Sequence, residues 1–468
     1  MLSYPKYFSN KSQLWHTTCF EKSCQFFDYC QRIINLIPKT SEPAAKQSVT
    51  DFTRKRKLTF PKLITFILCL SVSGKNAGVD IKSGIFFNNA RRNGLWPEAT
   101  AVHRSAITKA LPKVPWTIFQ DLLGEAVKVA YQSWPDQPKY LWHGMSVLAI
   151  DGSKYTLPAS AELRAAFDPH SGLQYPGKGH YPQCLVSTLY DVFRRLPIAR
   201  HVGPRDSSER EAAIKLLPFV PPNSLLLLDR GYPGYDFIRE LQQQYSGHFL
   251  MRCTANYTFP AVERFIHSNK NEDIIYLQPS NKALNQLKSE ERKNLRPIKI
   301  RVIRLNGPDG TVSVLLTNLF DRKTFHYNEF IALYFRRWEV ETYYRDEKIV
   351  LEVEQFHGQT VNSIIQELLA APIMTVISRT MMVLASDATA AGAIEPQFKN
   401  AILTLASEAA VLAPEDPESA VIIFNDILQA ISRVKYYRPK RPRPPAPRVT
   451  KRAINKWATA RLTKVAHA

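Results

Sequence analysis

The spacing of hydrophobic and polar positions changes along the chain. Residues 1–60 are polar and have little periodicity. From about residue 145, short apolar runs bounded by turn residues predict β-strands that alternate with helical patterns. Helical patterns follow the segment 255–320 and continue to about residue 432. This alternation predicts the α/β class, with one mixed sheet and covering helices.

Apolar runs mark the expected strands. Residues 255–320 are polar at first and then contain two strand-like runs about the turn NGPDG, which we interpret as a β-rich insertion. The expected strands are Ser146–Ile150, Gln183–Val192, Leu196–Gly203, Leu225–Leu228 and His248–Thr254, with Ile298–Leu305 and Thr311–Leu319 in the insertion.

Helices are expected before the first strand. Thr59 is a candidate N-cap of a helix that has a proline in its first turn. The segment Pro97–Pro112 has the pattern of a helix-turn-helix pair, in which Arg104 and Lys109 would contact DNA. An ordinary surface helix explains this pattern equally well.

The stretch YFRRWEVETYYRDEK, Tyr334–Lys348, combines aromatic and charged residues on one predicted helix. At about 100° per residue, four ionisable side chains fall within about 60° of one another, with Arg345 at the edge of the group. These four side chains, the ionisable seam, are Tyr334, Arg337, Glu341 and Lys348.

Two apolar flanks border the seam, and we expect both to be buried. They are Ile331, Phe335, Trp338 and Ile349 on one side, and Leu333, Val340 and Tyr344 on the other. The far side of the helix is expected to be solvated and carries Arg336, Glu339, Asp346 and Glu347. A buried charge is costly unless it is paired or binds a metal. The seam is therefore either a structural ion pair of Glu341 with Arg337 or Lys348, or a carboxylate directed at a metal or a phosphate.

Two more carboxylates stand where apolar strands are expected to end. Asp151 follows SVLAI, and Asp229 follows the four-leucine run. Sites in open α/β sheets lie at such strand ends, so these two residues and Glu341 could form one set. Three carboxylates suit two Mg²⁺ ions about 4 Å apart, which activate a hydroxyl and stabilise the leaving oxygen of a phosphodiester. The alternative is that Asp-Gly and Asp-Arg-Gly are ordinary turns.

The positive charge is concentrated at the two ends of the chain. The net charge is +21, and residues 433–468 contain twelve Lys or Arg and no acidic residue. Residues 1–60 contain ten Lys or Arg and four Asp or Glu. Basic ends on a nearly neutral body indicate a polyanionic partner such as DNA or RNA. Solubilising tails are the alternative.

The cysteines and the hydropathy pattern favour an intracellular protein. The six cysteines contain no C-x-x-C pair, and the spacing of Cys19, Cys24 and Cys30 fits no standard zinc template. Reduced thiols in a cytoplasm are expected. The longest apolar run, Leu63–Val72, is too short to span a bilayer, and the N-terminus lacks the order of a signal peptide.

The seam residues match the pattern Y-(2)-R-(3)-E-(6)-K without a gap. This signature resembles that of DDE insertion-sequence transposases of family four, in the YREK branch. LAIDGSKYTLP around Asp151 and LLDRGYPGYD around Asp229 resemble the two Asp motifs of that family, and LEVEQFHGQT resembles its continuation after Lys348. The resemblance covers roughly residues 50–380.

The resemblance implies a ribonuclease-H-like catalytic core, a helical DNA-binding N-terminal region and a basic tail. The implied domains are 1–135 (helical, DNA-binding), 140–254 with 321–385 (core), 255–320 (β-rich insertion), 386–432 (C-terminal helices) and 433–468 (basic Pro/Arg tail).

The resemblance also assigns roles to residues. Asp151, Asp229 and Glu341 would be catalytic and would bind Mg²⁺, for which Mn²⁺ can substitute. DNA phosphates would meet Tyr334, Arg337, Lys348 and Arg345.

The implied activity is cut-and-paste DNA transposition. The implied partners are double-stranded transposon ends and target DNA, together with a second copy of the chain in a synaptic complex. The implied location is the bacterial cytoplasm, associated with the nucleoid and with no membrane. Two alternatives stay open: a catalytically silent DNA-binding protein derived from a transposase, and a plain metal-dependent nuclease.

Overall fold

The computed structural model describes residues 52, 57–72, 78–134, 138–170, 180–254, 259–268, 270–279, 295–306, 311–387 and 396–434. The chain divides into two units, Met1–Lys435 and Tyr436–Ala468, and all described residues belong to the first unit. The basic ends and Cys19, Cys24 and Cys30 therefore lie largely outside the described residues.

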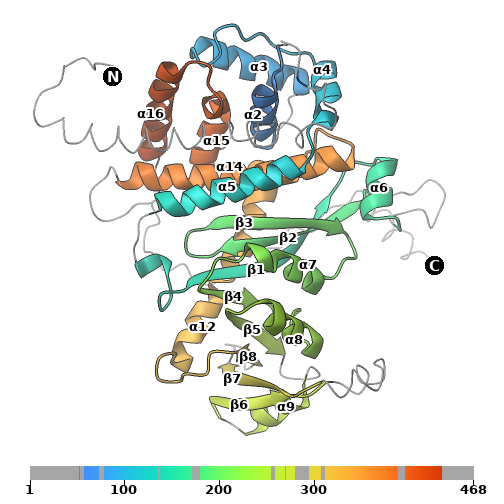
Figure 1. Cartoon of the computed structure of the whole chain (residues 1–468), viewed down its shortest axis with the longest axis vertical. Coiled ribbons are helices and arrows are strands. Elements are labelled where there is room, and N and C mark those ends of the chain that lie inside the picture. Colours follow the sequence, from blue (N-terminus) through green and yellow to red (C-terminus); the bar gives the residue numbers. More distant parts are fainter. Residues whose placement is uncertain are drawn as a thin grey trace, which may run out of the picture. The chain divides into compact units, whose positions relative to one another are not determined.

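Eight strands form one mixed sheet, in the order β3-β2-β1-β4-β5-β8-β7-β6 (Figure 1). β4 is parallel to both β1 and β5, and all other neighbouring strands are antiparallel. The chain is thus of the expected mixed α/β class, and the strands of the predicted insertion extend the same sheet through β8. The strands are β1 (Ser146–Thr156), β2 (Gln183–Asp191), β3 (Leu196–Pro204), β4 (Ser224–Leu228), β5 (His248–Thr254), β6 (Glu272–Leu277), β7 (Ile298–Asn306) and β8 (Val312–Thr317).

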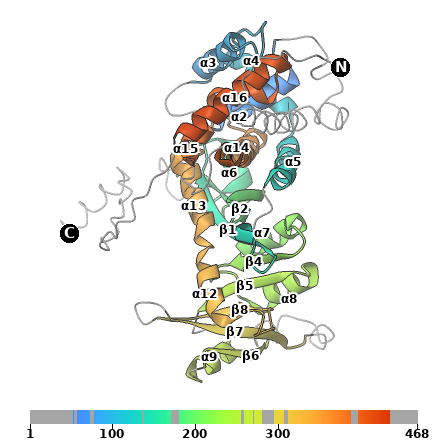
Figure 2. The same cartoon turned by 90° about the vertical axis from the view of Figure 1, so that its left-hand side faces the viewer.

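Helices cover both faces of this sheet. The five residues of β4 are all buried, as expected for a central parallel strand. Figure 2 shows α12 (Tyr327–Phe335) and α13 (Trp338–Asp346) along one face, and α7 (Glu209–Leu216) and α8 (Tyr235–Gln244) along the other. The expected single helix over Tyr334–Lys348 is thus divided between α12, α13 and a π-helix, Glu347–Leu351.

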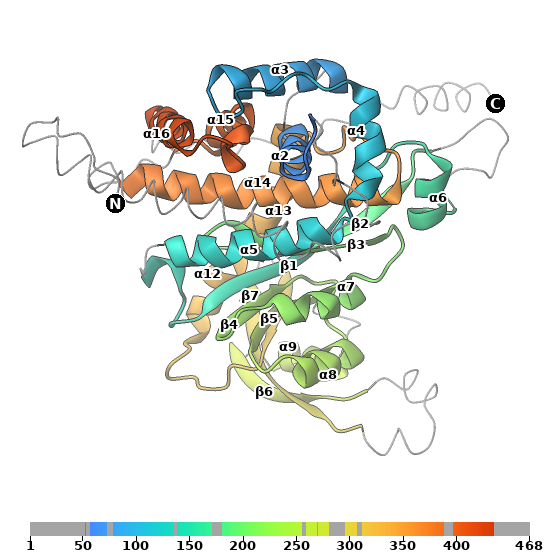
Figure 3. The same cartoon turned by 45° about the horizontal axis from the view of Figure 1, so that its top comes forward.

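A long helix, α14 (Val361–Asp387), joins the sheet to the remaining helices. Figure 3 shows α5 on one side of α14, and α2, α15 and α16 on the other. The remaining α-helices are α2 (Phe60–Leu70), α3 (Val79–Arg92), α4 (Arg104–Ala110), α5 (Thr117–Ser133), α6 (Ala161–Phe167), α9 (Pro260–His267), α15 (Phe398–Ser407) and α16 (Pro417–Arg433).

Helix α14 is the longest apolar segment among the described residues. Val361–Ser386 has a mean hydropathy of 1.8 and is long enough to cross a membrane, but 83% of its apolar window is buried inside the structure. The expectation that Leu63–Val72 is the longest apolar segment was therefore wrong. Polar residues such as Gln366 and Thr375 interrupt the run in the sequence, yet they lie on a helix that is packed nearly all round.

The predicted helix-turn-helix pair is not formed. Only the seven-residue α4 and a 3₁₀ turn, Leu111–Lys113, occupy its place. The preceding segment, residues 97–103, is not helical, and tertiary contacts hold it at both ends: the indole of Trp96 donates to the carbonyl of Ala413, and the Val102 amide donates to the Ser83 hydroxyl. These contacts override the local helical pattern. By contrast, α2 begins after Thr59 with a proline in its first turn, as predicted.

A buried aspartate closes the hairpin of β2 and β3. Asp191 is fully buried, and its carboxylate accepts hydrogen bonds from the Tyr131 hydroxyl (2.8 Å), the amides of Phe193 and Arg194, and the Arg194 guanidinium (3.0 Å). Burial raises the pKa of Asp191, whereas Arg194 and these hydrogen bonds lower it. The carboxylate therefore fixes the turn of the hairpin that lies beside β1.

Replacing Asp191 with Asn should destabilise the protein, because the new amide group faces donors that the carboxylate now satisfies. We expect the free energy of unfolding to fall by about 2–3 kcal/mol. Urea denaturation measures this change. Asp206→Asn, at an aspartate whose side chain is 71% exposed, is the control and should change stability by less than about 0.5 kcal/mol. Equal effects of the two substitutions would contradict this role of Asp191.

A candidate carboxylate site between β1, β4 and α13

The strand pairing places Asp151 next to the end of β4. β1 and β4 are paired in parallel up to Ala149 opposite Leu227, and β4 ends one residue later at Leu228. If this register is continued two residues beyond Ala149 and Leu227, Asp151 stands opposite Asp229. Asp151 does not end its strand, as the sequence suggested, because β1 continues against β2 to Thr156. It lies where β1 loses its parallel neighbour.

The third carboxylate, Glu341, comes from α13. It accepts a hydrogen bond from Nη2 of Arg337 at 2.6 Å, one helical turn earlier. Arg337 is 8% exposed, and its Nε is buried without a hydrogen-bond partner. The structural ion pair of Glu341 with Arg337, which the sequence left open as an alternative, is therefore present in this structure. It leaves Nε of the guanidinium without a hydrogen bond.

The electrostatics of Asp151 show that these groups influence one another. Burial raises its pKa to about 7; Arg337 lowers it, while Asp229, Glu341 and Glu209 raise it. Three other carboxylates and one arginine thus act on this carboxyl group. The arrangement stores negative charge that a bound cation would relieve.

The carboxylates are near one another but not closed around a point. Among the described residues, no group of three or more His, Cys, Asp or Glu side chains is arranged to hold a metal ion. Glu341 is turned to Arg337, and Oδ1 of Asp229 accepts a hydrogen bond from the Gly231 amide at 2.6 Å. The oxygen donors suit Mg²⁺, which takes carboxylate ligands and retains several waters. In this structure Arg337 occupies Oε1 of Glu341.

The rest of the ionisable seam surrounds this site. Tyr334 is 4% exposed, and burial raises its pKa, with an opposing effect of Arg337 and a further raising effect of Asp229. Nζ of Lys348 donates to Oγ of Ser153 at 2.9 Å and to the carbonyl of Lys154 at 2.6 Å. Lys348 thus lies beside the second half of β1.

The other proposed DNA contacts lie apart from the seam or on its edge. Arg345 is exposed on α13. Arg104 and Lys109 are exposed on α4, which packs against α3 and the following 3₁₀ turn. Figure 3 shows α4 among the helices beyond α14, so the structure does not bring these two residues to the carboxylates.

One of the two apolar flanks that border the ionisable seam was predicted wrongly. Val340 and Tyr344 are buried as expected, but Phe335, Trp338 and Ile349 are 50–66% exposed. The helical pattern identifies an apolar face, but it does not show which face meets the sheet. Glu347 was also wrong: it was expected in solvent and is fully buried, because a buried arginine of β3 pairs with it.

Glu209 is a neighbouring carboxylate that the sequence did not indicate. It is the first residue of α7, and its Oε1 would lie 3.0 Å from a Cβ at position 152. Burial raises its pKa, and so does Asp229. Ser208 precedes it at the N-cap position without a side-chain capping bond. The one local signal was Gly152, because a residue without a side chain leaves room for Glu209 to approach β1.

The raised pKa of Asp151 predicts a pH-dependent stability. An aspartate of ordinary pKa 3.8 is already ionised in the unfolded chain at pH 5, whereas folded Asp151 keeps its proton up to about pH 7. Wild-type stability should therefore fall as the pH rises from about 4 to 7, and Asp151→Asn should escape this loss. We expect the stability advantage of the variant over wild type to be about 2–3 kcal/mol larger at pH 8 than at pH 5.

Urea denaturation in EDTA at both pH values measures this difference. The exposed Asp206→Asn is again the control and should show no such change. An effect of Asp151→Asn that does not vary with pH would contradict the raised pKa.

Comparison with known proteins identifies relatives of the segment that contains this site. The family described as "Transposase DDE domain" matches residues 142–377, which is half of the chain. "Transposase InsG for insertion sequence element IS4" of Escherichia coli (strain K12) is 26% identical over 240 residues, covering 50% of this chain and 52% of the relative. "Putative transposase InsZ" of the same organism is 25% identical over 123 residues, covering 26% of this chain and 41% of the relative. The chain thus spans about half of the length of these curated relatives.

Among solved structures, a piggyBac transposase synaptic complex with hairpin DNA aligns with 91% of this chain and 86% of its own, at a TM-score of 0.38 and 10% identity. The kinship with insertion-sequence transposases of family four is confirmed by the sequence relatives, while the YREK branch stays a prediction. Asp151, Asp229 and Glu341 all lie within the matched segment, and the chain belongs to the transposase DDE domain family.

Proposed function

We propose that this chain is a DNA transposase that cleaves the ends of a mobile element and joins the freed 3′-hydroxyls to target DNA. The observation that carries the proposal is the β1–β4 register, which brings Asp151 beside Asp229 with Glu341 of α13 acting on the same carboxyl group. Membership of the transposase family supports the same activity.

We propose that the sheet and its helices form a ribonuclease-H-like core. Its support is the strand order β3-β2-β1-β4-β5, in which β2 alone runs against the other four strands. Asp151 would sit on the central strand of this core, where the neighbour on one side is antiparallel and the neighbour on the other side is parallel.

DDE transposases depend on a metal ion, and Mg²⁺ is the ion proposed here. When bound, it activates a water or a 3′-hydroxyl and stabilises the leaving oxygen of the phosphodiester. Asp151 and Asp229 would hold it from the sheet, and Glu341 from the helix after turning away from Arg337. Mn²⁺ would serve as a substitute.

The cations of the seam would bind the phosphate next to the cleaved bond. Nε of Arg337 supports this role because it is buried without a partner, and Nη2 would become available if Glu341 turned to a metal. Lys348, held at Ser153, would place a second positive charge beside β1. Tyr334 and the exposed Arg345 would complete the contacts to one strand.

The proposed partners are double-stranded transposon ends and target DNA, with a second copy of the chain in a synaptic complex. The basic ends of the chain would add contacts to phosphates away from the site. Arg104 and Lys109 are proposed as further contacts on α4. A bacterial cytoplasm with access to the nucleoid is the proposed location.

Glu341→Ala should abolish Mg²⁺-dependent cleavage of a duplex that carries the element's ends, because one of three metal ligands is lost. We expect a fall of more than about 1,000-fold, with the affinity for that duplex changed less than about threefold. Glu339→Ala is the matched control: Glu339 lies on the same helix but pairs with Arg195 at 3.4 Å, and its loss should leave cleavage nearly unchanged.

The products separate the alternatives. Wild type that binds the duplex without cleaving it would favour a silent DNA-binding protein. Cleavage without joining of the 3′-hydroxyl to target DNA would favour a nuclease.

The Pro/Arg tail should contribute to the salt dependence of binding. Residues 436–468 carry ten Lys or Arg and no acidic residue. Replacing Arg438, Lys440, Arg441 and Arg443 with Ser should make the slope of log affinity against log salt shallower, by up to about 3.6 if all four meet phosphates. Binding titrations at several salt concentrations measure the slope. An unchanged slope would exclude these four residues from the interface.

A further inference from the structure

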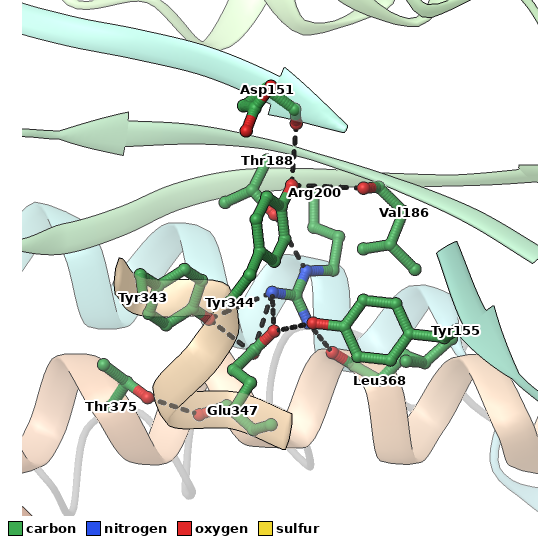
Figure 4. Close-up of polar contacts among 11 residues, drawn as sticks. Asp151, Tyr155, Val186, Thr188, Arg200, Tyr343, Tyr344, Glu347, Leu368 and Thr375 are labelled. Carbon is green, nitrogen blue, oxygen red and sulfur yellow. Dashed lines mark hydrogen bonds and ion pairs between the residues drawn. The ribbon is translucent and has the colours of Figure 1, made fainter. Parts of the chain in front are cut away.

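A buried ion pair lies beside the candidate site without belonging to it. The side chains of Arg200 in β3 and Glu347 in the π-helix are both 0% exposed, and Nη2 of Arg200 lies 2.8 Å from each carboxylate oxygen (Figure 4). The partners are 147 residues apart in the sequence. They connect the strand at one edge of the sheet to the helix that carries Glu341.

Neighbouring groups satisfy both charges. The hydroxyls of Tyr155 and Tyr343 donate to Glu347, and Arg200 also donates to the Tyr343 hydroxyl at 3.0 Å. Nε of Arg200 donates to Oγ1 of Thr188 at 3.3 Å. We call these five residues the polar knot. It ties together β1, β2, β3, α13 and the π-helix.

Arg200 also donates a hydrogen bond to a backbone carbonyl of α14 that has no donor within the helix. Pro372 has no amide hydrogen, so the carbonyl of Leu368, four residues earlier, has no helical donor. Nη1 of Arg200 donates to this carbonyl at 2.6 Å. A helix that would otherwise be weakened at its proline is thereby held to the sheet.

Stability alone does not explain the pair. Burying two charges costs several kcal/mol per ion, and apolar replacements of a buried ion pair are often neutral or stabilising. A fully satisfied polar network, in contrast, permits only one arrangement of the elements that contribute to it. The distinguishing property of the knot is therefore the geometry that it selects.

That geometry extends directly to Asp151. Tyr344 follows Tyr343 on α13, and its hydroxyl lies 2.7 Å from the carbonyl of Asp151 and 3.1 Å from that of Val186. Figure 4 shows Tyr344 standing between the knot and Asp151. Lys348 likewise follows Glu347, and its Nζ lies over the ring of Tyr155 at 4.6 Å. Residues adjacent to knot members therefore contact β1 at Asp151 and again between Ser153 and Tyr155.

We propose that the Arg200–Glu347 pair is a positioning device that holds α13 and the π-helix in the one register in which Glu341 acts on Asp151 and Lys348 reaches Ser153. The proposal rests on the proposed function, since positioning is measured against metal binding and cleavage. The positioning role predicts that removing the pair leaves the melting temperature nearly unchanged but lowers the cleavage rate and the metal affinity.

An apolar variant tests this separation. Arg200→Met and Glu347→Leu remove the pair, Tyr155→Phe and Tyr343→Phe remove the hydroxyls that would lose their acceptor, and Pro372→Ala restores the missing helical donor. We expect a melting temperature no more than about 5 °C below that of wild type. The kcat of cleavage should fall about 100-fold, and Mn²⁺ affinity without DNA, measured by calorimetry, at least about tenfold. The Kd for DNA should stay within about threefold.

A second ion pair, of a fully buried arginine with a glutamate that is 19% exposed, provides the control. Arg301 in β7 is 0% exposed and lies 2.5 Å from Glu272 in β6. Arg301→Met with Glu272→Leu should leave kcat and Mn²⁺ affinity within about threefold of wild type. An apolar variant of the knot that folds and matches wild type in both quantities overturns the positioning role and leaves the proposed function intact. A wild-type protein with neither Mn²⁺ binding nor cleavage overturns both.

Tyr344→Phe decides the question if the apolar variant does not fold. It keeps the ion pair and removes only the hydroxyl that contacts the Asp151 carbonyl. We expect an unchanged melting temperature with kcat and Mn²⁺ affinity each lowered about tenfold. Unchanged kcat and Mn²⁺ affinity would overturn the proposal.

Discussion

The site depends on how β1 is paired in the sheet. Antiparallel β2 accompanies β1 to its end, whereas parallel β4 accompanies only its first half. The strand therefore opens on one side just where Asp151 stands, and the chain that leaves β4 places Asp229 there. Such a change between neighbours is where α/β sheets provide room for a ligand. The helix α13, which packs on β1, then needs only the correct rotation to add Glu341.

The rotation of α13 and the following π-helix about their axis is constrained by charged side chains on two sides. Arg337 and Glu341 pair with each other at 2.6 Å beside the site. Glu347 faces the interior and pairs with Arg200. Glu341 and Glu347 lie on one short helical segment. Rotating this segment about its axis would therefore move both glutamates away from their arginine partners. The helix opens into a π turn at Glu347, a form that is frequent at functional sites.

The sequence predicted local features of this arrangement better than long-range ones. Strand runs such as Gln183–Val192 and the seam of Arg337 and Glu341 follow from periodicity, and the structure contains both. The pairing of β1 with β4 does not, because the partners lie about 78 residues apart and no local signal specifies them. Asp151 and Asp229 could therefore be listed together but not placed.

The errors share one cause. Glu347 looked solvated because its partner Arg200 stands far away in the sequence, and Trp338 looked buried because an apolar side chain does not show which face of its helix is covered. The helical pattern before Arg104 was overridden by contacts of Trp96 with the C-terminal helical region. In each case a tertiary contact decided what a local pattern left open.

We propose that Asp151, Asp229 and Glu341 hold metal ions together. Anomalous diffraction from crystals grown with Mn²⁺ locates such ions without relying on activity. We expect Mn²⁺ peaks bounded by these three carboxylates, with Glu341 turned away from Arg337. Mn²⁺ bound elsewhere, with the Glu341–Arg337 pair intact at concentrations that support cleavage, would contradict it.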